Sequence, residues 1–512
     1  MDFGVRFYVD PAQYDANLQL ASFSAAAYDP ANAPVLLRPI LVNGVKFAQD
    51  PLTGKNYGQG LVGAFAPGHG DPANGDIIGG KNGVPRGLYS VKPIVAAPRF
   101  GFSWDPTGGQ MMSISGGCGV YYDRIQGNPV MGQISNPPTV FSPTQYYGTF
   151  ADFKDTASAG FLAPSGSVSS LATPGHQQTI YNYNLNIERQ IKKAFMQISY
   201  AGMLARHQLW QRNINPVPLG ASFLNINPQN RDLSTTGNVL PPNFLRPYQG
   251  FGDILMYEFA NSSNYNSLQM TFRQRMGKGF NIGANYTFSK ALDSSDSYGQ
   301  QVDAFLPTKS RNYGPAGFNR AHVFNTNFYW TLPRLSRNVS FALARWVANN
   351  WTISSVLRFN TGGPFTPGYS TLNGIATPTG SASASARVQV VDPSAPYATR
   401  FSPPPQPAGQ GNVAWSTTST APQLGNLGKN TMTGPGTSNA DFNLSRDLKF
   451  SERLKGQLRF EAYNALNQTQ FTSLDTTLRF NNTTGEMYNT LFNTPTAARP
   501  ARRIQLALRI NF

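Results

Sequence analysis

The C-terminal part of the chain contains three runs in which apolar and polar side chains alternate almost without error. They occupy residues 442–450, 454–466 and 502–512. The last run has five apolar residues, Ile504, Leu506, Leu508, Ile510 and Phe512, separated mostly by polar ones. Because successive side chains of a β-strand point to opposite faces, each run predicts a strand with one apolar and one polar face. Each run has about the ten residues that a tilted strand needs to cross a bilayer.

Two architectures produce this alternation: a transmembrane β-barrel with lipid outside and a wet lumen, and an antiparallel sheet in a soluble sandwich. Composition favours the barrel. Charged residues make up only 13% of the chain, against about a quarter in most soluble domains. No run of about 18 apolar residues occurs, so no transmembrane helix is predicted. The sequence therefore predicts an all-β protein, an antiparallel transmembrane β-barrel with long extracellular loops.

The same alternation recurs from the N-terminus onwards, in predicted strands that are joined by short turns and long loops in turn. Strands are expected at 2–9, 17–24, 97–104, 110–123, 268–275, 280–289, 320–332 and 350–361, with a hairpin at 179–202. Short turns on one rim and long loops on the other are typical of transmembrane barrels. We predict about 12 to 14 strands of a larger barrel. The principal loops are expected at 124–177, 203–262, 291–317 and 362–436.

Residues that could carry catalysis or bind metals are few and scattered. The four histidines, His69, His176, His207 and His322, have no metal-ligand spacing, and the one cysteine, Cys118, excludes an internal disulfide. His322, with Asp293 and Asp296 before it, is the best candidate for a hydrolase triad assembled in space, and a rim histidine is the alternative. With Asp303, the two aspartates suggest either a calcium loop or a solvated acidic loop. We predict no catalytic residue, no metal and no cofactor, and therefore not an enzyme.

The glycine-rich run at 116–119 has two interpretations. A phosphate-binding loop should follow a strand and open a helix. Here the glycines lie inside a predicted strand that continues to Tyr121 and Tyr122. Close packing or a bend of a barrel strand is therefore the favoured interpretation.

The candidate ligand-binding residues lie in the long loops and on the predicted lumen face. The loop candidates are aromatic: Tyr146, Tyr147, Trp210 and Tyr298, with packing inside the loops as the alternative. The lumen candidates are Arg273, Arg275 and Arg358, accompanied by Lys455, Arg459 and Arg509. Such a basic face suits an anionic ligand. The preferred interpretation is structural: these cations dock an acidic plug or pair with Glu461 and Asp447 in the wall.

The chain has a formal net charge of +16, from 41 basic and 25 acidic residues. A basic surplus is compatible with nucleic acid, anionic lipid or an anionic ligand. The basic residues are scattered along the strands and loops without a compact cluster, which argues against nucleic-acid binding. Lumen faces and outer-membrane lipid are the expected partners of these charges.

A resemblance to a known family is carried by the segments 97–102, 105–108, 116–120, 122–124, 263–269, 286–290, 318–322, 460–467 and Asn511-Phe512. They resemble TonB-dependent outer-membrane receptors, and more narrowly the Oar-like receptors of Acidobacteria and Myxobacteria, a subgroup with an N-terminal carboxypeptidase-regulatory-like domain. Together they extend over nearly the whole chain. They belong to the barrel framework, so they point to the family and not to the ligand.

The resemblance implies a barrel of about 22 strands, an N-terminal plug and a TonB box. The first ten residues lack the basic start and apolar core of a signal peptide and resemble a strand instead. We therefore expect residues 1–512 to be the C-terminal part of a receptor barrel, without plug, TonB box or signal peptide. The expected location is the bacterial outer membrane.

The resemblance also implies a function. The expected function is uptake, or export, of a large unidentified ligand (a siderophore, glycan, peptide or protein). The energy would come from TonB-ExbB-ExbD, acting through the missing N-terminal part. A passive porin, a surface adhesin and, less favoured, a barrel-embedded hydrolase are the alternatives.

Overall fold

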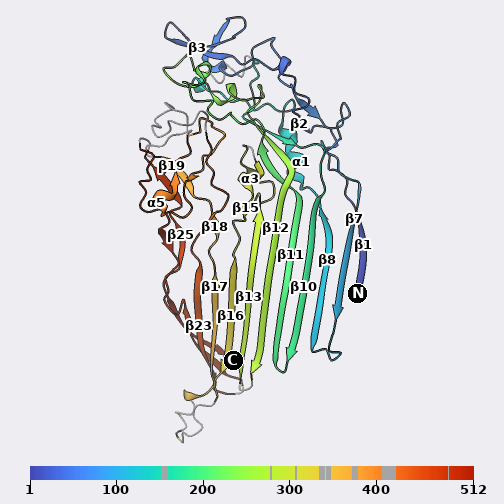
Figure 1. The fold of residues 1–512 in the computed structure, drawn as a ribbon, viewed down its shortest axis with the longest axis vertical. Coiled ribbons are helices and arrows are strands. Elements are labelled where there is room, and N and C mark those ends of the chain that lie inside the picture. Colours follow the sequence, from blue (N-terminus) through green and yellow to red (C-terminus); the bar gives the residue numbers. More distant parts are fainter. Residues whose placement is uncertain are drawn as a thin grey trace.

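Twelve long strands form one continuous, curved antiparallel sheet, which we call the wall (Figure 1). The computed structural model describes residues 1–151, 160–276, 279–305, 308–333, 341, 347–371, 379–405, 423–451, 453–481 and 484–512. The wall strands, in their order across the sheet, are β1 (Asp2–Val9), β7 (Ile94–Trp104), β8 (Met112–Asp123), β10 (Gln178–Ile191), β11 (Ala194–Asn213), β12 (Asp253–Met276), β13 (Phe280–Asp293), β16 (His322–Thr331), β17 (Trp351–Asn360), β23 (Thr437–Lys449), β24 (Lys455–Tyr463) and β28 (Arg503–Asn511).

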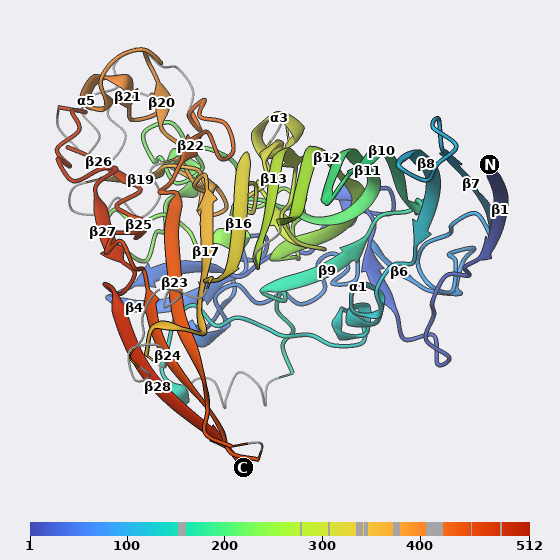
Figure 2. The same cartoon turned by 90° about the horizontal axis from the view of Figure 1, so that it is seen from below.

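The wall confirms the predicted all-β class, its antiparallel strand order and the predicted number of barrel strands. Each wall strand pairs with the next one along the chain, as in an up-and-down barrel. Figure 2, viewed along the strands, shows an open arc with β1 at one edge and β28 at the other. Within the described residues no pairing joins these two edges. None of the described helices is long and apolar enough to span a membrane.

The strand register places apolar side chains on one face of the wall and polar ones on the other. On the outer face, for example, Ile198 of β11 lies between Ile187 of β10 and Met270 of β12. On the inner face, the adjacent Gln197 lies between Glu188 and Thr271. The same division continues across the sheet because a period of two keeps every second residue on one face.

Two glycine positions in the wall allow close packing. A Cβ at Gly202 would lie 2.1 Å from the ring of Tyr183, so this ring covers the glycine on the outer face. A Cβ at Gly116 would lie 2.8 Å from both the ring of Phe102 and the carbonyl oxygen of Asn184. The run at 116–119 is thus part of β8 and packs closely against its neighbours, as the favoured interpretation predicted.

The long connections gather at one end of the wall and form a folded structure, which we call the cap (Figure 1). It consists of residues 10–93, 124–177, 214–252, 294–321, 361–436 and 464–502, as far as these are described. Its elements up to residue 171 are β2 (Ala21–Phe23), η1 (Pro30–Asn32), β3 (Arg38–Val42), β4 (Val45–Gln49), β5 (Asn56–Gly58), η2 (Gln59–Leu61), β6 (Asp76–Ile78), α1 (Gly127–Met131), η3 (Gly132–Ser135) and β9 (Ser167–Leu171). The later ones are η4 (Pro228–Asn230), η5 (Pro242–Phe244), β14 (Gln301–Val302), α3 (Thr308–Asn312), β15 (Gly314–Pro315), β18 (Pro364–Phe365), β19 (Gly368–Thr371), β20 (Gln389–Val390), α5 (Tyr397–Arg400), β21 (Phe401–Ser402), β22 (Met432–Thr433), β25 (Phe471–Leu474), β26 (Thr477–Phe480) and β27 (Pro495–Ala498).

The hydrophobic core of the protein lies in the cap and at the adjoining ends of β11 and β12. One cluster surrounds Phe23 and includes Val168, Phe251 and Ile254. Another packs Val388, Phe401, Leu427, Leu478, Phe480 and Phe492, from the two C-terminal connections. Parallel pairing of β19 with β26 joins these two connections. The cap is therefore held by burial of apolar side chains, like a soluble domain.

The expected boundaries are wrong at two places. The segment 203–262 is not one loop: β11 continues to Asn213 and β12 begins at Asp253, so only the residues between them connect the strands. The ladder is irregular between Ala205 and Trp210 and then continues to Asn213. Leu209 and Phe259 in this part of the two strands are buried. The expected strand at 17–24 is only the three-residue β2, which pairs with β6 inside the cap.

Candidate functional site

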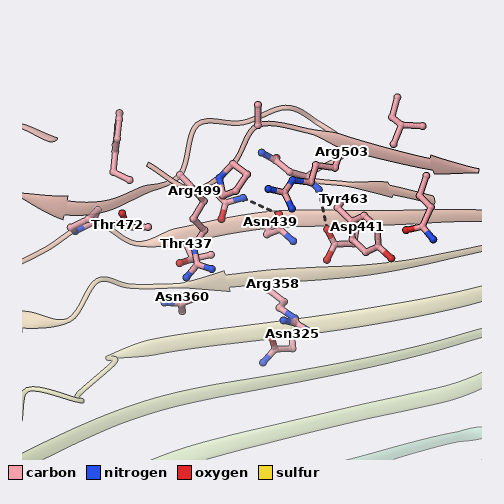
Figure 3. A pocket seen from close by; sticks show the side chains of 18 of the residues that line it. Asn325, Arg358, Asn360, Thr437, Asn439, Asp441, Tyr463, Thr472, Arg499 and Arg503 are labelled. Atoms are coloured by element: carbon pink, nitrogen blue, oxygen red, sulfur yellow. Dashed lines mark hydrogen bonds between the residues drawn. The ribbon is translucent and has the colours of Figure 1, made fainter. Parts of the chain in front are cut away.

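A large pocket lies on the inner face of the wall, where its last five strands meet the cap. Its volume is about 1050 Å³. The wall contributes Asn325, Arg358, Asn360, Thr437, Asn439, Asp441, Tyr463, Arg503, Ile504 and Gln505, and the cap contributes Arg320, Pro435, Asn464, Gln470, Phe471, Thr472, Arg499, Pro500 and Ala501. Figure 3 shows the labelled side chains projecting into this common space. We call it the junction pocket.

The register explains why polar side chains line the junction pocket. Asn325 of β16 pairs with Arg358 of β17, which pairs with Asn439 of β23. Paired residues of antiparallel strands share a face, so the three side chains form a row across the inner face. The cap closes over this row: Gln470 Nε2 donates to Asn439 Oδ1 at 2.9 Å. The pocket thus presents amides and guanidinium groups, which hydrogen-bond to polar solutes.

The three predicted lumen arginines all lie on the inner face, but the structure does not bring them together. Arg358 lines the junction pocket. Arg273 and Arg275 line a second cavity of about 1360 Å³ with Lys192 and Lys193, near the short turns of the wall. We call this second cavity the turn-end pocket. The inner face therefore has two separate basic regions.

The expected pairing of lumen cations with Glu461 and Asp447 is not observed. Asp447 Oδ1 accepts a hydrogen bond from Gln457 Nε2 at 2.9 Å, and Glu461 Oε2 accepts one from the hydroxyl of Tyr463 at 3.1 Å. Arg459 Nε donates to Gln457 Oε1 at 2.5 Å. Among the described residues, no ion pair involves Arg273, Arg275, Arg358, Lys455, Arg459 or Arg509.

Two of the four loop aromatics belong to the junction between wall and cap. Trp210 is not in a loop but in β11, where it is 5% exposed and donates from Nε1 to Glu258 Oε2 at 2.8 Å. Tyr298 is partly buried, and its hydroxyl accepts a hydrogen bond from the backbone N–H of Gln126 at 2.9 Å. Both side chains hold the structure together, and the burial of Trp210 leaves it no free surface for a ligand.

Tyr146 and Tyr147 are also engaged in packing within the cap. The ring of Tyr146 lies against Gly63, where a Cβ would approach it to 2.9 Å. Tyr147 donates from its hydroxyl to Asp232 Oδ2, and the Nζ of Lys46 lies 3.5 Å from its ring centroid. Burial and this hydrogen bond to Asp232 raise the pKa of Tyr147 above its usual value. The alternative interpretation, loop packing, describes the environment of both residues.

Arg320, Arg499 and Arg503 were not identified from the sequence as candidate ligand-binding residues. Arg503 shares the polar face of its run with Gln505 and Arg509, so the alternation already placed it on the inner face. The expected strand at 320–332 included Arg320, but β16 begins at His322. Arg320 and Arg499 therefore lie in irregular segments before β16 and β28, where alternation does not predict the direction of a side chain. Only the tertiary structure places them beside Arg358.

The suggested catalytic and calcium-binding groups have other contacts. The ring nitrogen Nδ1 of His322 lies 2.8 Å from the hydroxyl of Tyr286, and the His322 ring packs against Phe288 on the outer face. Lys429 Nζ lies 2.5 Å from Asp293 Oδ1 and 3.1 Å from Asp296 Oδ1. Asp303 is paired with Arg311 at 2.7 Å. These aspartates therefore form ion pairs in the cap and at the adjoining end of β13, and not a solvated acidic loop.

Among the described residues, no group of three or more His, Cys, Asp or Glu side chains is arranged to hold a metal ion. A model of the family described as "Outer membrane beta barrel domain" matches residues 1–505. A comparison with curated proteins gave no match.

Three similar solved structures are two transporters and a siderophore receptor. The outer membrane transporter YddB from Escherichia coli is 11% identical, with a TM-score of 0.40 over 82% of this chain and 41% of that one. The siderophore receptor PirA from Acinetobacter baumannii is 11% identical, with a TM-score of 0.38 over 82% and 41%. The FrpB iron transporter from Neisseria meningitidis is 11% identical, with a TM-score of 0.36 over 82% and 39%. The chain spans about two fifths of the length of these proteins.

Proposed function

We propose that this chain, which belongs to the outer-membrane β-barrel domain family, forms the C-terminal part of a TonB-dependent receptor of the Oar-like group. The family places it in the bacterial outer membrane, with outer-membrane lipid against its apolar face. In this proposal the receptor imports, or exports, a large polar ligand. TonB-ExbB-ExbD would drive it through a part of the receptor that lies outside residues 1–512.

The observation that carries the transport proposal is the continuous polar inner face with its two large pockets. The junction pocket lies under the cap and the turn-end pocket lies near the opposite rim of the wall. Asn325 lines the first and Asn327, two residues further along β16, lines the second. A solute on this face therefore has polar contacts from the cap towards the turns, as a transport path requires.

The size of the wall supports the proposal of a longer receptor. Twelve strands are fewer than the roughly 22 of the barrels that the sequence resembles. In the described structure the edges β1 and β28 pair with no partner beyond their one neighbour. Unpaired backbone groups cost several kcal/mol each in lipid, so further strands would stabilise both edges.

The test is the intact mass of the native polypeptide, purified from outer membranes with antibodies against the cap. We expect a mass well above the 55.7 kDa of residues 1–512. We also expect N-terminal peptides with a TonB box, and loss of ligand uptake when that box is deleted. A native mass of 55.7 kDa would overturn the proposal of a TonB-dependent receptor.

A passive porin is the second candidate, because a polar inner face by itself permits diffusion. Conductance of the purified native protein in a planar bilayer separates the two functions. A receptor that is closed in the absence of TonB should give no steady current. A porin should conduct without any energy source.

A further inference from the structure

The junction pocket carries an excess of positive charge. Its lining includes four arginines, Arg320, Arg358, Arg499 and Arg503, and only one carboxylate, Asp441. In the described part of the chain, none of these arginines forms an ion pair. Figure 3 shows Arg358 reaching the space from β17, and Arg499 and Arg503 reaching it from the start of β28 and the residues just before it. An arrangement of unpaired guanidinium groups favours the binding of an anion.

The inner-face carboxylates near these arginines are satisfied by neutral donors. Asp441 Oδ1 accepts a hydrogen bond from the backbone N–H of Asn464 at 3.0 Å. Glu461 Oε2 accepts a hydrogen bond from the hydroxyl of Tyr463. Neutral donors stabilise a carboxylate without cancelling the charge of a nearby arginine. The wall therefore does not neutralise the arginines by the ion pairs that a purely structural role would require.

The guanidinium group of Arg320 also has uncharged hydrogen-bond partners. Its Nη1 donates to the backbone carbonyl of Asn319 at 2.7 Å and to that of Gly317 at 3.3 Å. These bonds fix the guanidinium group, and since carbonyls carry no net charge, its positive charge stays available. A preorganised cation loses less conformational entropy when it binds an anion.

The turn-end pocket repeats the same charge pattern. Lys192, Lys193, Arg273 and Arg275 line it, and no carboxylate is part of its described lining. The lining also contains the amide side chains of Gln190, Gln274, Asn281, Asn285 and Asn327. The two pockets thus form basic regions at different heights of one inner face, joined by amide side chains.

We infer that the ligand carried along this inner face is a multivalent anion, rich in carboxylate or phosphate groups, and that Arg358, Arg499 and Arg503 recognise it in the junction pocket. This inference rests on the proposed transport function and specifies its ligand class. Guanidinium groups bind carboxylate and phosphate oxygens in a bidentate manner. Basic side chains along a pore select anions over cations and neutral solutes.

The test measures binding of two probes, citrate and tripolyphosphate, to the purified native receptor in neutral detergent by calorimetry. Spermidine serves as the cationic probe, and an acidic hexapeptide represents a protein segment. We expect saturable binding of at least one small anion, weakening as salt is raised because the contacts are electrostatic. Binding of citrate alone would assign carboxylate recognition, and binding of tripolyphosphate alone would assign phosphate recognition.

The decisive variant is the double substitution R358Q/R503Q. It removes two charge-assisted contacts, so we expect the dissociation constant for the anion to rise by about tenfold or more. The matched control is R189Q, because Arg189 is an exposed arginine in β10 whose register places it on the outer face, opposite Met112 and Met196. R189Q should bind the anion within about twofold of the wild type. If the double variant does not fold, R358Q alone replaces it.

Three results would overturn the inference. They are no saturable binding of citrate, tripolyphosphate or the acidic hexapeptide, unchanged affinity in R358Q/R503Q, and binding of spermidine alone. These results are independent of the mass of the native polypeptide. A long TonB-dependent chain that binds none of these anions would disprove the inference and leave the proposed function in place. A native chain of 55.7 kDa that conducts and binds citrate would disprove the TonB-dependent function and leave the inference of an anionic ligand in place.

Discussion

The wall and the cap use the same apolar residue types in opposite ways. In the cap, Phe23 is 2% exposed and packs against Tyr248 and Phe251, with ring centroids 4.9 Å apart in both pairs. In the wall, Phe100 is 41% exposed on the outer face. The cap excludes water from its own interior, whereas the wall exposes its apolar side chains to lipid. Burial by itself therefore does not identify the membrane region; the period of the pattern does.

The largest expected effect comes from truncating a core residue of the cap. Phe23→Ala leaves a cavity among tightly packed aromatic rings, so we expect it to destabilise the cap by about 3 to 5 kcal/mol. Limited proteolysis in detergent should show faster cleavage of cap segments while the wall stays protected. Phe100→Ala is the matched control. Lipid or detergent fills the space that it leaves on the outer face, so the loss of stability should be much smaller. Equal losses of stability in both variants would contradict the distinction between a water-excluding cap and a lipid-facing wall.

A charge on the outer face tests the wall. Ile198→Arg places a guanidinium group in the apolar band of β11, where the side chain is now 45% exposed. We expect a loss of about 2 to 4 kcal/mol in lipid vesicles, measured by urea unfolding with tryptophan fluorescence. Gln197→Arg, one residue away on the inner face, should stay within about 0.5 kcal/mol of the wild type. If the two variants behaved alike, the assignment of the faces would be wrong.

The smallest expected effect concerns Asp76 in the cap. Burial, and to a lesser degree the charge of Asp71, raises the pKa of Asp76 to about 8. Its Oδ2 is buried with no hydrogen-bond partner among the described residues. Between about pH 4, where the unfolded carboxyl ionises, and pH 8, the folded state holds the extra proton. The free energy of unfolding contributed by this group therefore falls as the pH rises through that window.

Asp76→Asn removes this titration. We expect the variant to exceed the wild type in stability at pH 8, by on the order of 2 kcal/mol, and to lose this advantage towards pH 4. Thermal unfolding of the cap at both pH values, followed by near-ultraviolet circular dichroism, is the measurement. A wild type that is more stable than the variant at pH 8 would show that Asp76 is ionised and favourably bound in the folded state.

The fold was largely predictable because the wall follows a simple rule. Every second residue faces lipid, so alternation in 2–9, 179–202 or 502–512 is sufficient to find a strand and assign its faces. The prediction was weaker where β11 and β12 leave the membrane. There the outer environment is no longer lipid, and the segment 203–262 resembles one loop although both of its ends belong to paired strands.

The site was only half predictable. Arg273, Arg275 and Arg358 were placed on the inner face by the period of their strands, and the structure puts them there. The aromatic candidates were chosen by residue type alone. Aromatic side chains are as useful for packing as for binding, and Tyr147 and Trp210 are engaged in packing.

The sequence by itself determined the membrane wall of this protein: its strands, their two faces, and the basic character of the inner one. A local period of two carries that information, because each residue needs only its neighbours in the chain to define its face. The tertiary structure decided the cap and the junction pocket. Arg320, Arg358 and the neighbouring pair Arg499 and Arg503 come from three separate parts of the chain. Only non-local packing of the cap onto the wall determines that they share one space.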